Sequence, residues 1–239
     1  MSEAIRQNAK LGRWCTVALF AVAMAWMESA VVFYLRTMVD RIEPYQSNPL
    51  PLVGGLGGVE LVREAATLLM VLTVGMLAGR TWSGKMAYSA IAFGLRDIFY
   101  YVFLRVICAW PRNIMDWDVL FLLPLPWWGP VIAPILIALL MIIWGSVVVW
   151  RDEKPVPCGA GLPCWVANAV GIVIALYVFM EDALRVAGQG ETAIRNVLPE
   201  TFNWPLFMVA LSLMAAPILR LGWAAWSGRS IPISDRITT

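Results

Sequence analysis

The strongest constraint on this chain of 239 residues is a series of six long apolar stretches. A helix needs about 20 consecutive, mostly apolar residues to cross the hydrocarbon core of a bilayer. Hydrophobic residues make up 60% of the chain and charged residues 14%, whereas soluble domains average about 45–50% and about 25%. We therefore predict one all-α domain over residues 1–239, a polytopic bundle of about six transmembrane helices in a lipid bilayer. The predicted spans cover approximately residues 14–35, 60–79, 86–110, 131–150, 165–182 and 204–221.

The distribution of lysine and arginine predicts how this bundle is oriented in the membrane. Cytoplasmic connections are enriched in these two residues, most clearly where the connections are short. With the N-terminus inside, ten basic residues fall on the cytoplasmic side and seven on the outer side, and Arg96 falls inside a span. The cytoplasmic segments are also shorter, so their basic residues are denser. We therefore expect both ends of the chain in the cytoplasm.

The absence of histidine from the chain excludes several kinds of site. Histidine-ligated haem, zinc and copper centres need this residue, as do Ser-His and Cys-His catalytic pairs. Cys158 and Cys164 enclose five residues, a poor spacing for zinc, and we expect them to be reduced cytoplasmic thiols. The net charge of +2 comes from dispersed basic residues, which argues against nucleic acid as a partner. We predict no cofactor and no metal site.

Several ionisable side chains fall inside the predicted spans, in the half of the bilayer away from the cytoplasm. Glu28, for example, lies 15 residues beyond Arg13, which is about 22 Å along a helix that rises about 1.5 Å per residue. A charge at the centre of a span costs about 2.5–3.5 kcal/mol on insertion scales, so such residues should face other helices and find partners. The candidate site, which we call the polar cluster, contains Glu28, Arg63, Glu64, Arg96, Asp97, Tyr100 and Tyr101.

Within the polar cluster we expect Arg96 to pair with Glu28 and Glu64, because a buried guanidinium favours carboxylate partners. Asp97 and Tyr101 are four residues apart and share one ridge of their helix. Two interpretations stay open at this point. Either the charges lock the first three helices together and do nothing else, or they line a polar cavity for a proton or for a small anionic or zwitterionic solute.

Two outer connections are rich in proline or glycine. Residues 48–58 read NPLPLVGGLGG, a loop interrupted by proline and glycine that we expect to hold no regular helix. Residues 111–130 end in FLLPLPWWGP, which is too broken to span the membrane and too apolar to be simply solvated. We expect this second connection to lie in the outer interface or to fold back on the bundle, since irregular backbone cannot face lipid. Gly75 and Gly79, four residues apart, predict a close-packed face on the second helix.

Several short stretches carry a resemblance to a known family. They are FGLRDIFYY from Phe93, Trp117-Asp118, PLPWWGP from Pro124, Glu28 followed by Tyr34-Leu35-Arg36, and Arg63-Glu64-Ala65-Ala66. In these stretches the chain resembles a family of bacterial polytopic inner-membrane proteins of uncharacterised activity. The resemblance implies a multi-pass protein of the bacterial inner membrane. It brings no activity, cofactor or catalytic residue to this chain.

Two functions of different classes fit this sequence. The first is a non-catalytic integral membrane subunit or accessory protein of a larger bacterial membrane complex, with other membrane-protein subunits as its partners. The lack of cofactor ligands, the tryptophans at both predicted interfaces and the elaborate outer connections favour it. The second is a small-solute or proton transporter, or a membrane-embedded enzyme, that uses the polar cluster. We favour the first function and assign no catalytic residue.

Overall fold

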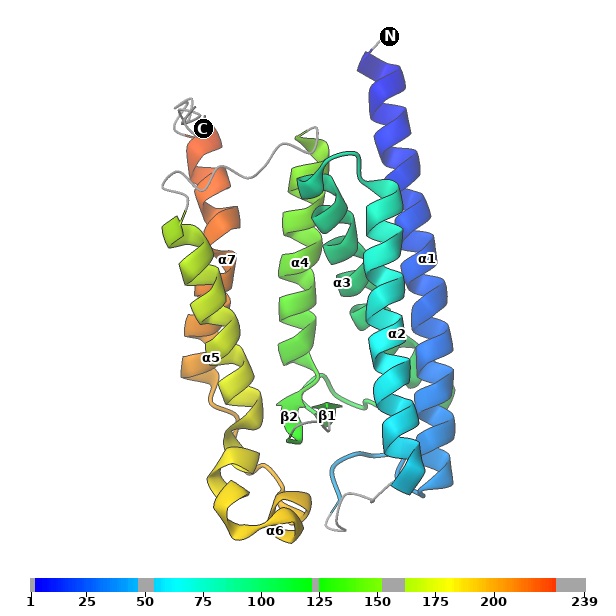
Figure 1. Ribbon diagram of the computed structural model, residues 1–239, viewed down its shortest axis with the longest axis vertical. Helices are drawn as coiled ribbons and strands as arrows, with labels where there is room; N and C mark the ends of the chain where they lie inside the picture. The colour runs from blue at the N-terminus through cyan, green and yellow to red at the C-terminus, as the bar shows by residue number, and fades with distance from the viewer. Residues whose placement is uncertain (1–2, 47–53, 122–124, 152–161, 227–239) are drawn as a thin grey trace.

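The computed structural model of this protein describes residues 3–46, 54–121, 125–151 and 162–226. It is a bundle of long helices that run side by side (Figure 1), which confirms the predicted all-α class. A 3-10 turn (Ala187–Gln189) and the short α6 (Glu191–Asn196) connect α5 to α7, and the two strands are β1 (Trp117–Phe121) and β2 (Trp127–Pro130). The long helices are α1 (Glu3–Met38), α2 (Gly54–Ala78), α3 (Trp82–Cys108), α4 (Ile132–Trp150), α5 (Leu162–Val186) and α7 (Trp204–Trp226).

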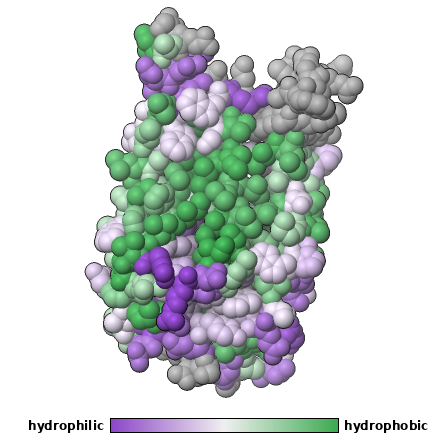
Figure 2. Space-filling model, turned by 180° about the vertical axis from the view of Figure 1, so that it is seen from behind, coloured by the Kyte–Doolittle hydropathy of each residue, from purple (hydrophilic) through white to green (hydrophobic). Residues whose placement is uncertain are grey.

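Four of these helices, α1, α2, α4 and α5, are long and apolar enough to cross a membrane. The apolar stretch of α7 is shorter, Trp204–Leu219, and α3 carries Arg96 and Asp97 near its middle. Both α3 and α7 nevertheless pack against α4 within the same bundle. Apolar side chains form a broad band across the molecule, with polar side chains gathered towards its two ends (Figure 2). This is the surface expected of a membrane protein.

The start of α1 and the end of α7 lie at the same end of the bundle (Figure 1), as an even number of passes requires. We call this the inner end and the opposite one the outer end, following the orientation predicted from the basic residues. The polar cluster and the β-hairpin lie towards the outer end.

The helix at the centre of the bundle is α3, which packs against α1, α2 and α4. Small residues allow this close approach. Gly75 of α2 and Gly79, which directly follows α2, lie against Ser89 and Lys85 of α3, so the close packing predicted for these two glycines is confirmed. Helix α5 pairs with α7, and this pair reaches the rest of the bundle through contacts of α7 with α4 and of α5 with β2.

The connection rich in proline and tryptophan folds back on the bundle as an antiparallel hairpin. Trp117 pairs with Pro130 and Val119 with Trp128, and Trp128 is buried, with 1% of its surface exposed. Strand β2 contacts α4 and α5, so one of the two predicted placements of this connection, folding back on the bundle, is confirmed. Pairing of the two strands satisfies backbone groups that irregular chain would leave open.

One expectation about the outer connections is wrong. Helix α2 begins at Gly54, so the last five residues of the segment 48–58 are helical. The first N–H groups of a helix need no partner within the helix. Glycine adopts helical dihedral angles as well, although at an entropic cost, so a glycine-rich segment can form a first turn when the helix beyond it is strongly apolar.

Candidate functional site

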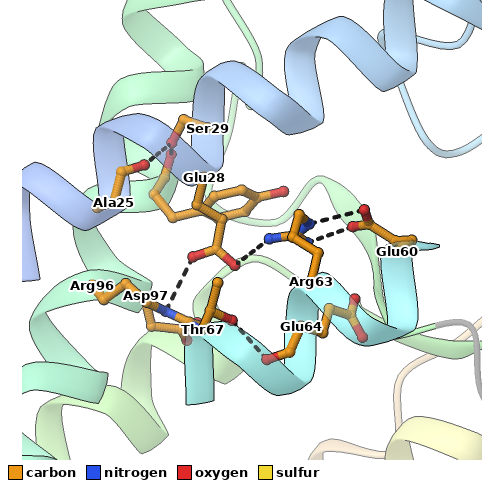
Figure 3. Close-up of polar contacts among 10 residues, drawn as sticks. Ala25, Glu28, Ser29, Glu60, Arg63, Glu64, Thr67, Arg96 and Asp97 are labelled. Atoms are coloured by element: carbon orange, nitrogen blue, oxygen red, sulfur yellow. Dashed lines mark hydrogen bonds and ion pairs between the residues drawn. The ribbon is translucent and has the colours of Figure 1, made fainter. Parts of the chain in front are cut away.

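The carboxylate of Glu28 is the centre of the polar cluster. One of its oxygens, Oε1, lies 3.5 Å from a terminal nitrogen of Arg63, and the other, Oε2, lies 3.2 Å from Nε of Arg96. The three residues come from α1, α2 and α3, and Figure 3 shows their charged groups directed towards one another. Their side chains are 11–21% exposed. A single carboxylate on α1 therefore joins α1 to both of the helices beside it.

Each of the two arginines also has a second carboxylate on its own helix. Nε of Arg63 donates to Glu60 over 2.8 Å, and a terminal nitrogen of Arg63 contacts the other oxygen of Glu60. A terminal nitrogen of Arg96 lies 3.4 Å from Oδ1 of Asp97. Charges of opposite sign thus alternate from Glu60 through Arg63, Glu28 and Arg96 to Asp97. Such alternation allows charged groups to be buried without leaving any one of them uncompensated.

Glu64 lies beside this chain of ion pairs but does not join it. The sequence predicts that Arg96 pairs with both Glu28 and Glu64, and the structure shows only the pairing with Glu28. Within the described part of the chain, no basic group lies within ion-pair distance of the Glu64 carboxylate, which stands apart from the dashed contacts in Figure 3. The backbone carbonyl of Glu64 accepts a hydrogen bond from the Thr67 hydroxyl over 2.8 Å. The rotation of about 100° between adjacent helical residues explains this, because Glu64 then points away from the side of α2 on which Arg63 meets Glu28.

Together with Glu60, the partner of Arg63, the polar cluster has more acidic than basic groups. Four carboxyl groups, those of Glu28, Glu60, Glu64 and Asp97, surround two guanidinium groups, those of Arg63 and Arg96. With every group ionised the formal charge would be two minus four, or −2. Glu64 is half-buried and lies within one of the helices long enough to span the membrane. The carboxyl group without a basic partner therefore lies within a candidate membrane span, where a lone charge is costly.

A second polar centre lies nearer the outer end, and sequence reasoning missed it. A terminal nitrogen of Arg36, in the last turn of α1, donates to Oδ1 of Asp118 in β1 over 2.8 Å. The same guanidinium lies 4.3 Å above the ring of Trp110. The Tyr101 hydroxyl and the Val119 N–H both contribute hydrogen bonds to the Asp118 carboxyl. This centre fastens the hairpin to α1 and α3.

Asp118 is 1% exposed, whereas the sequence suggests only an acidic residue in an outer connection. Its burial raises the pKa of the carboxyl above its usual range, and the nearby Arg36 guanidinium and Tyr101 hydroxyl offset part of this effect. One feature of the sequence could have indicated this burial, namely the position of Asp118 beside Trp117 in an apolar, proline-rich segment. An acid in such a segment must be paired when the segment folds inwards.

The two tyrosines of the polar cluster link the two centres. Tyr101 points to Asp118 rather than to the charges around Glu28, and its ring meets that of Tyr100 edge to face at 5.0 Å. The hydroxyl of Ser29, next to Glu28 on α1, bonds to the backbone carbonyls of Ala25 at 2.7 Å and Tyr100 at 3.0 Å. The structure thus brings Glu28, Arg63, Arg96 and Asp97 together and directs Tyr101 elsewhere.

The chemistry available to these residues is that of carboxylates and guanidinium groups. Among the described residues, no group of three His, Cys, Asp or Glu side chains is placed to hold a metal ion. Cys164 is a buried free thiol in α5, and Cys158 lies outside the described residues. Carboxylates at this depth can pair with cations or exchange protons, and guanidinium groups can hold anions once freed from their carboxylates.

Comparisons with known protein families, with curated proteins and with solved structures found no match to this chain.

Proposed function

We propose that this protein is a non-catalytic integral membrane subunit, or accessory protein, of a larger complex in the bacterial inner membrane. The observation that carries the proposal is the pairing of Glu28 with both Arg63 and Arg96. This pairing uses the buried charges to hold α1, α2 and α3 in one arrangement. Its assignment to the bacterial inner membrane rests on the family resemblance of the sequence.

A fixed set of ion pairs suits a scaffold better than a path for a solute. A guanidinium that binds an anionic solute needs a free face, whereas Arg63 and Arg96 each already contact two carboxylates. Releasing either arginine would leave a carboxylate uncompensated within the membrane, at a cost of about 1–3 kcal/mol for each buried group left unsatisfied. The arrangement therefore favours a role in which helices α1 to α3 do not separate.

The outer end adds support, because it presents apolar side chains beyond the ends of the helices. Ile114 and Met115, in the connection before β1, are each 53% exposed. Contact with another protein would remove such apolar side chains from water, which is favourable. The hairpin beside them is held firmly by Asp118 and Arg36, so this surface is preorganised and would lose little entropy on association.

The proposal is tested by isolating the full chain with its native surroundings. An affinity-tagged chain would be extracted from bacterial membranes with a styrene–maleic acid copolymer, and the particle would be examined by native mass spectrometry and blue native electrophoresis. We expect a second membrane protein in a constant stoichiometric ratio. Recovery of the 26.5 kDa chain alone, at a level that does not depend on expression of other proteins, would contradict the proposal.

The excess of acidic groups favours a second candidate function, the movement of a proton or a small solute through the polar cluster. Glu64 has no basic partner among the described residues, so its carboxyl is available to bind a proton. Under this alternative, Glu64→Gln and Asp97→Asn abolish transport while the amount of protein in the membrane stays constant. Under the subunit proposal the same substitutions change the association with partners instead. The two functions are therefore separated by comparing complex size with proton flux in vesicles made from the same preparation.

A further inference from the structure

Helix α2 is the least enclosed of the helices long enough to span the membrane. In its most apolar stretch 11% of the residues are buried, against 28% in the corresponding stretch of each of α1, α4 and α5. It packs chiefly on α3 and only slightly on α1, and it stands in front of both in Figure 1. Most of its circumference therefore faces outwards.

Glu64 lies at the edge of this open side. It is 14 residues before Ala78, the inner end of α2, which places it about 21 Å from that end and so within a hydrocarbon core of about 30 Å. At spacings of three, four and eight residues, Leu61, Leu68 and Leu72 continue the same side of the helix. Their side chains are 45%, 43% and 44% exposed. We call Leu61, Glu64, Leu68 and Leu72 the Glu64 face.

The charges beneath the Glu64 face indicate what covers it. Together with Glu60, the polar cluster holds four carboxyl groups and two guanidinium groups, and both guanidinium groups are paired with Glu28, Glu60 or Asp97. Lipid tails offer no counter-charge to Glu64, whereas an added lysine or arginine would supply one. A cationic side chain that approaches through this apolar surface would therefore balance the charge of the cluster.

We propose that the Glu64 face binds a transmembrane helix of a different membrane protein, and that a lysine or arginine on that helix pairs with Glu64. This inference rests on the proposed function, since it names the surface by which the subunit joins its complex. A second copy of the chain is a poor occupant because the basic residues at this depth that the structure describes, Arg63 and Arg96, are already paired. Small or aliphatic residues on the partner would pack against the three leucines.

The test uses a photo-cross-linking amino acid, p-benzoylphenylalanine, at Leu68 in the full chain in its native membranes. Leu139 of α4 is the matched control, because it is 41% exposed and lies on a different candidate span. We expect a covalent product with another membrane protein from position 68 and none from position 139. Peptide mapping should place the product in a transmembrane segment that has a lysine or arginine within one helical turn.

Substitutions at Glu64 then test the ion pair itself. Glu64→Gln should lower the yield of the product about tenfold, the loss expected for removing one charge-assisted contact between membrane helices. Glu64→Lys should abolish it, and replacing the mapped basic residue of the partner by glutamate should restore it. Leu72→Trp provides a second variant, because its added bulk should block the partner while leaving the contacts of the isolated chain unchanged.

Several results would overturn the inference. These are cross-linking at position 68 to lipid alone, to a second copy of this chain, or to a segment without a basic residue. A product that is unaffected by Glu64→Gln and by Leu72→Trp would also overturn it. If a stoichiometric partner is recovered but cross-links elsewhere, only this inference fails. If the chain is recovered alone, the proposed function fails with it.

Discussion

Gly94 of α3 packs against the backbone of α4, and Gly145 of α4 packs against the backbone of α3 in an equivalent way. A Cβ atom at Gly94 would lie 2.5 Å from the carbonyl oxygen of Ala138, and one at Gly145 would lie 2.5 Å from that of Ala87. An isoleucine side chain, of Ile142 in one case and Ile91 in the other, is 2.8 Å from the added atom. The motif Ala-x3-Ile-x2-Gly therefore occurs on both helices and brings two antiparallel backbones into close contact.

This reciprocal contact predicts that Gly94→Ala and Gly145→Ala destabilise the protein to a similar extent. Each added methyl group meets backbone, which cannot move aside, so we expect each to lower the free energy of unfolding by about 1–3 kcal/mol. Gly12→Ala in α1 is the control, since nothing lies within 4 Å of an added Cβ there. Unfolding by sodium dodecyl sulfate in mixed micelles, followed by circular dichroism, measures all three. An equal response at Gly12 and Gly94 would contradict the prediction.

The ion pair of Arg36 with Asp118 predicts a strong energetic coupling between α1 and the hairpin. Removing one partner leaves the other buried without its counter-charge, so Arg36→Gln and Asp118→Asn should each cost about 3 kcal/mol. The double variant should cost less than the sum of the two, with a coupling energy of about 1–3 kcal/mol. Thermal unfolding in detergent, followed by tryptophan fluorescence, measures the stability of the parent protein, the two single variants and the double variant. Additive effects would show that the two side chains act independently.

Glu28→Gln should destabilise the bundle, because the change removes the charge that Arg63 and Arg96 share. Both arginines keep a second carboxylate, so the expected loss is about 1–3 kcal/mol, together with a smaller amount of protein in the membrane. Glu43→Gln is the control: it removes an ion pair with Arg112 at the surface, where the two side chains are 47% and 76% exposed and such pairs contribute about 0–1 kcal/mol. Unchanged stability combined with loss of a transport activity would instead favour the alternative function.

The predicted orientation can be tested by labelling single cysteines in a variant whose four native cysteines are replaced. Arg112→Cys lies at the outer end and Arg151→Cys at the inner end of the bundle. A membrane-impermeant maleimide should label the first in intact spheroplasts and the second only after the membrane is permeabilised. The opposite pattern would reverse the topology predicted from the basic residues.

A depth in the membrane can be predicted for each charged residue from the sequence alone. The number of residues before Glu28 or Arg96, multiplied by a constant rise, predicts Glu28 in the outer half and Arg96 near the midplane or slightly outside it. Burial of these charges also followed, because an exposed charge in lipid is costly. Which carboxylate meets Arg96 could not be predicted in this way. Glu28 and Glu64 were equally suitable by charge and depth, and only the structure shows that Arg96 pairs with Glu28.

The partner of Asp118 could also be identified only from the structure. Nothing in the composition of its segment connects it to Arg36, which lies 82 residues earlier in the chain. The strand pairing of Trp117 with Pro130 and of Val119 with Trp128 turns the aspartate inwards. Sequence periodicity carries no signal for a contact of this kind, because two short strands and a helix end must all be placed before the charges meet.

By itself the amino-acid sequence determined that this is a helical membrane protein, because apolar helices of spanning length are a local property with a strong energetic preference for lipid. It also predicted that charged residues within the spans lie close together, as Glu28, Arg63 and Arg96 do. The tertiary structure decided which charges pair, because that depends on how each helix is rotated about its axis. The rotation is set by close contacts of small residues, such as those of Gly75 with Ser89 and Gly94 with Ala138. These contacts leave Glu64 at the edge of α2 with no basic partner among the described residues.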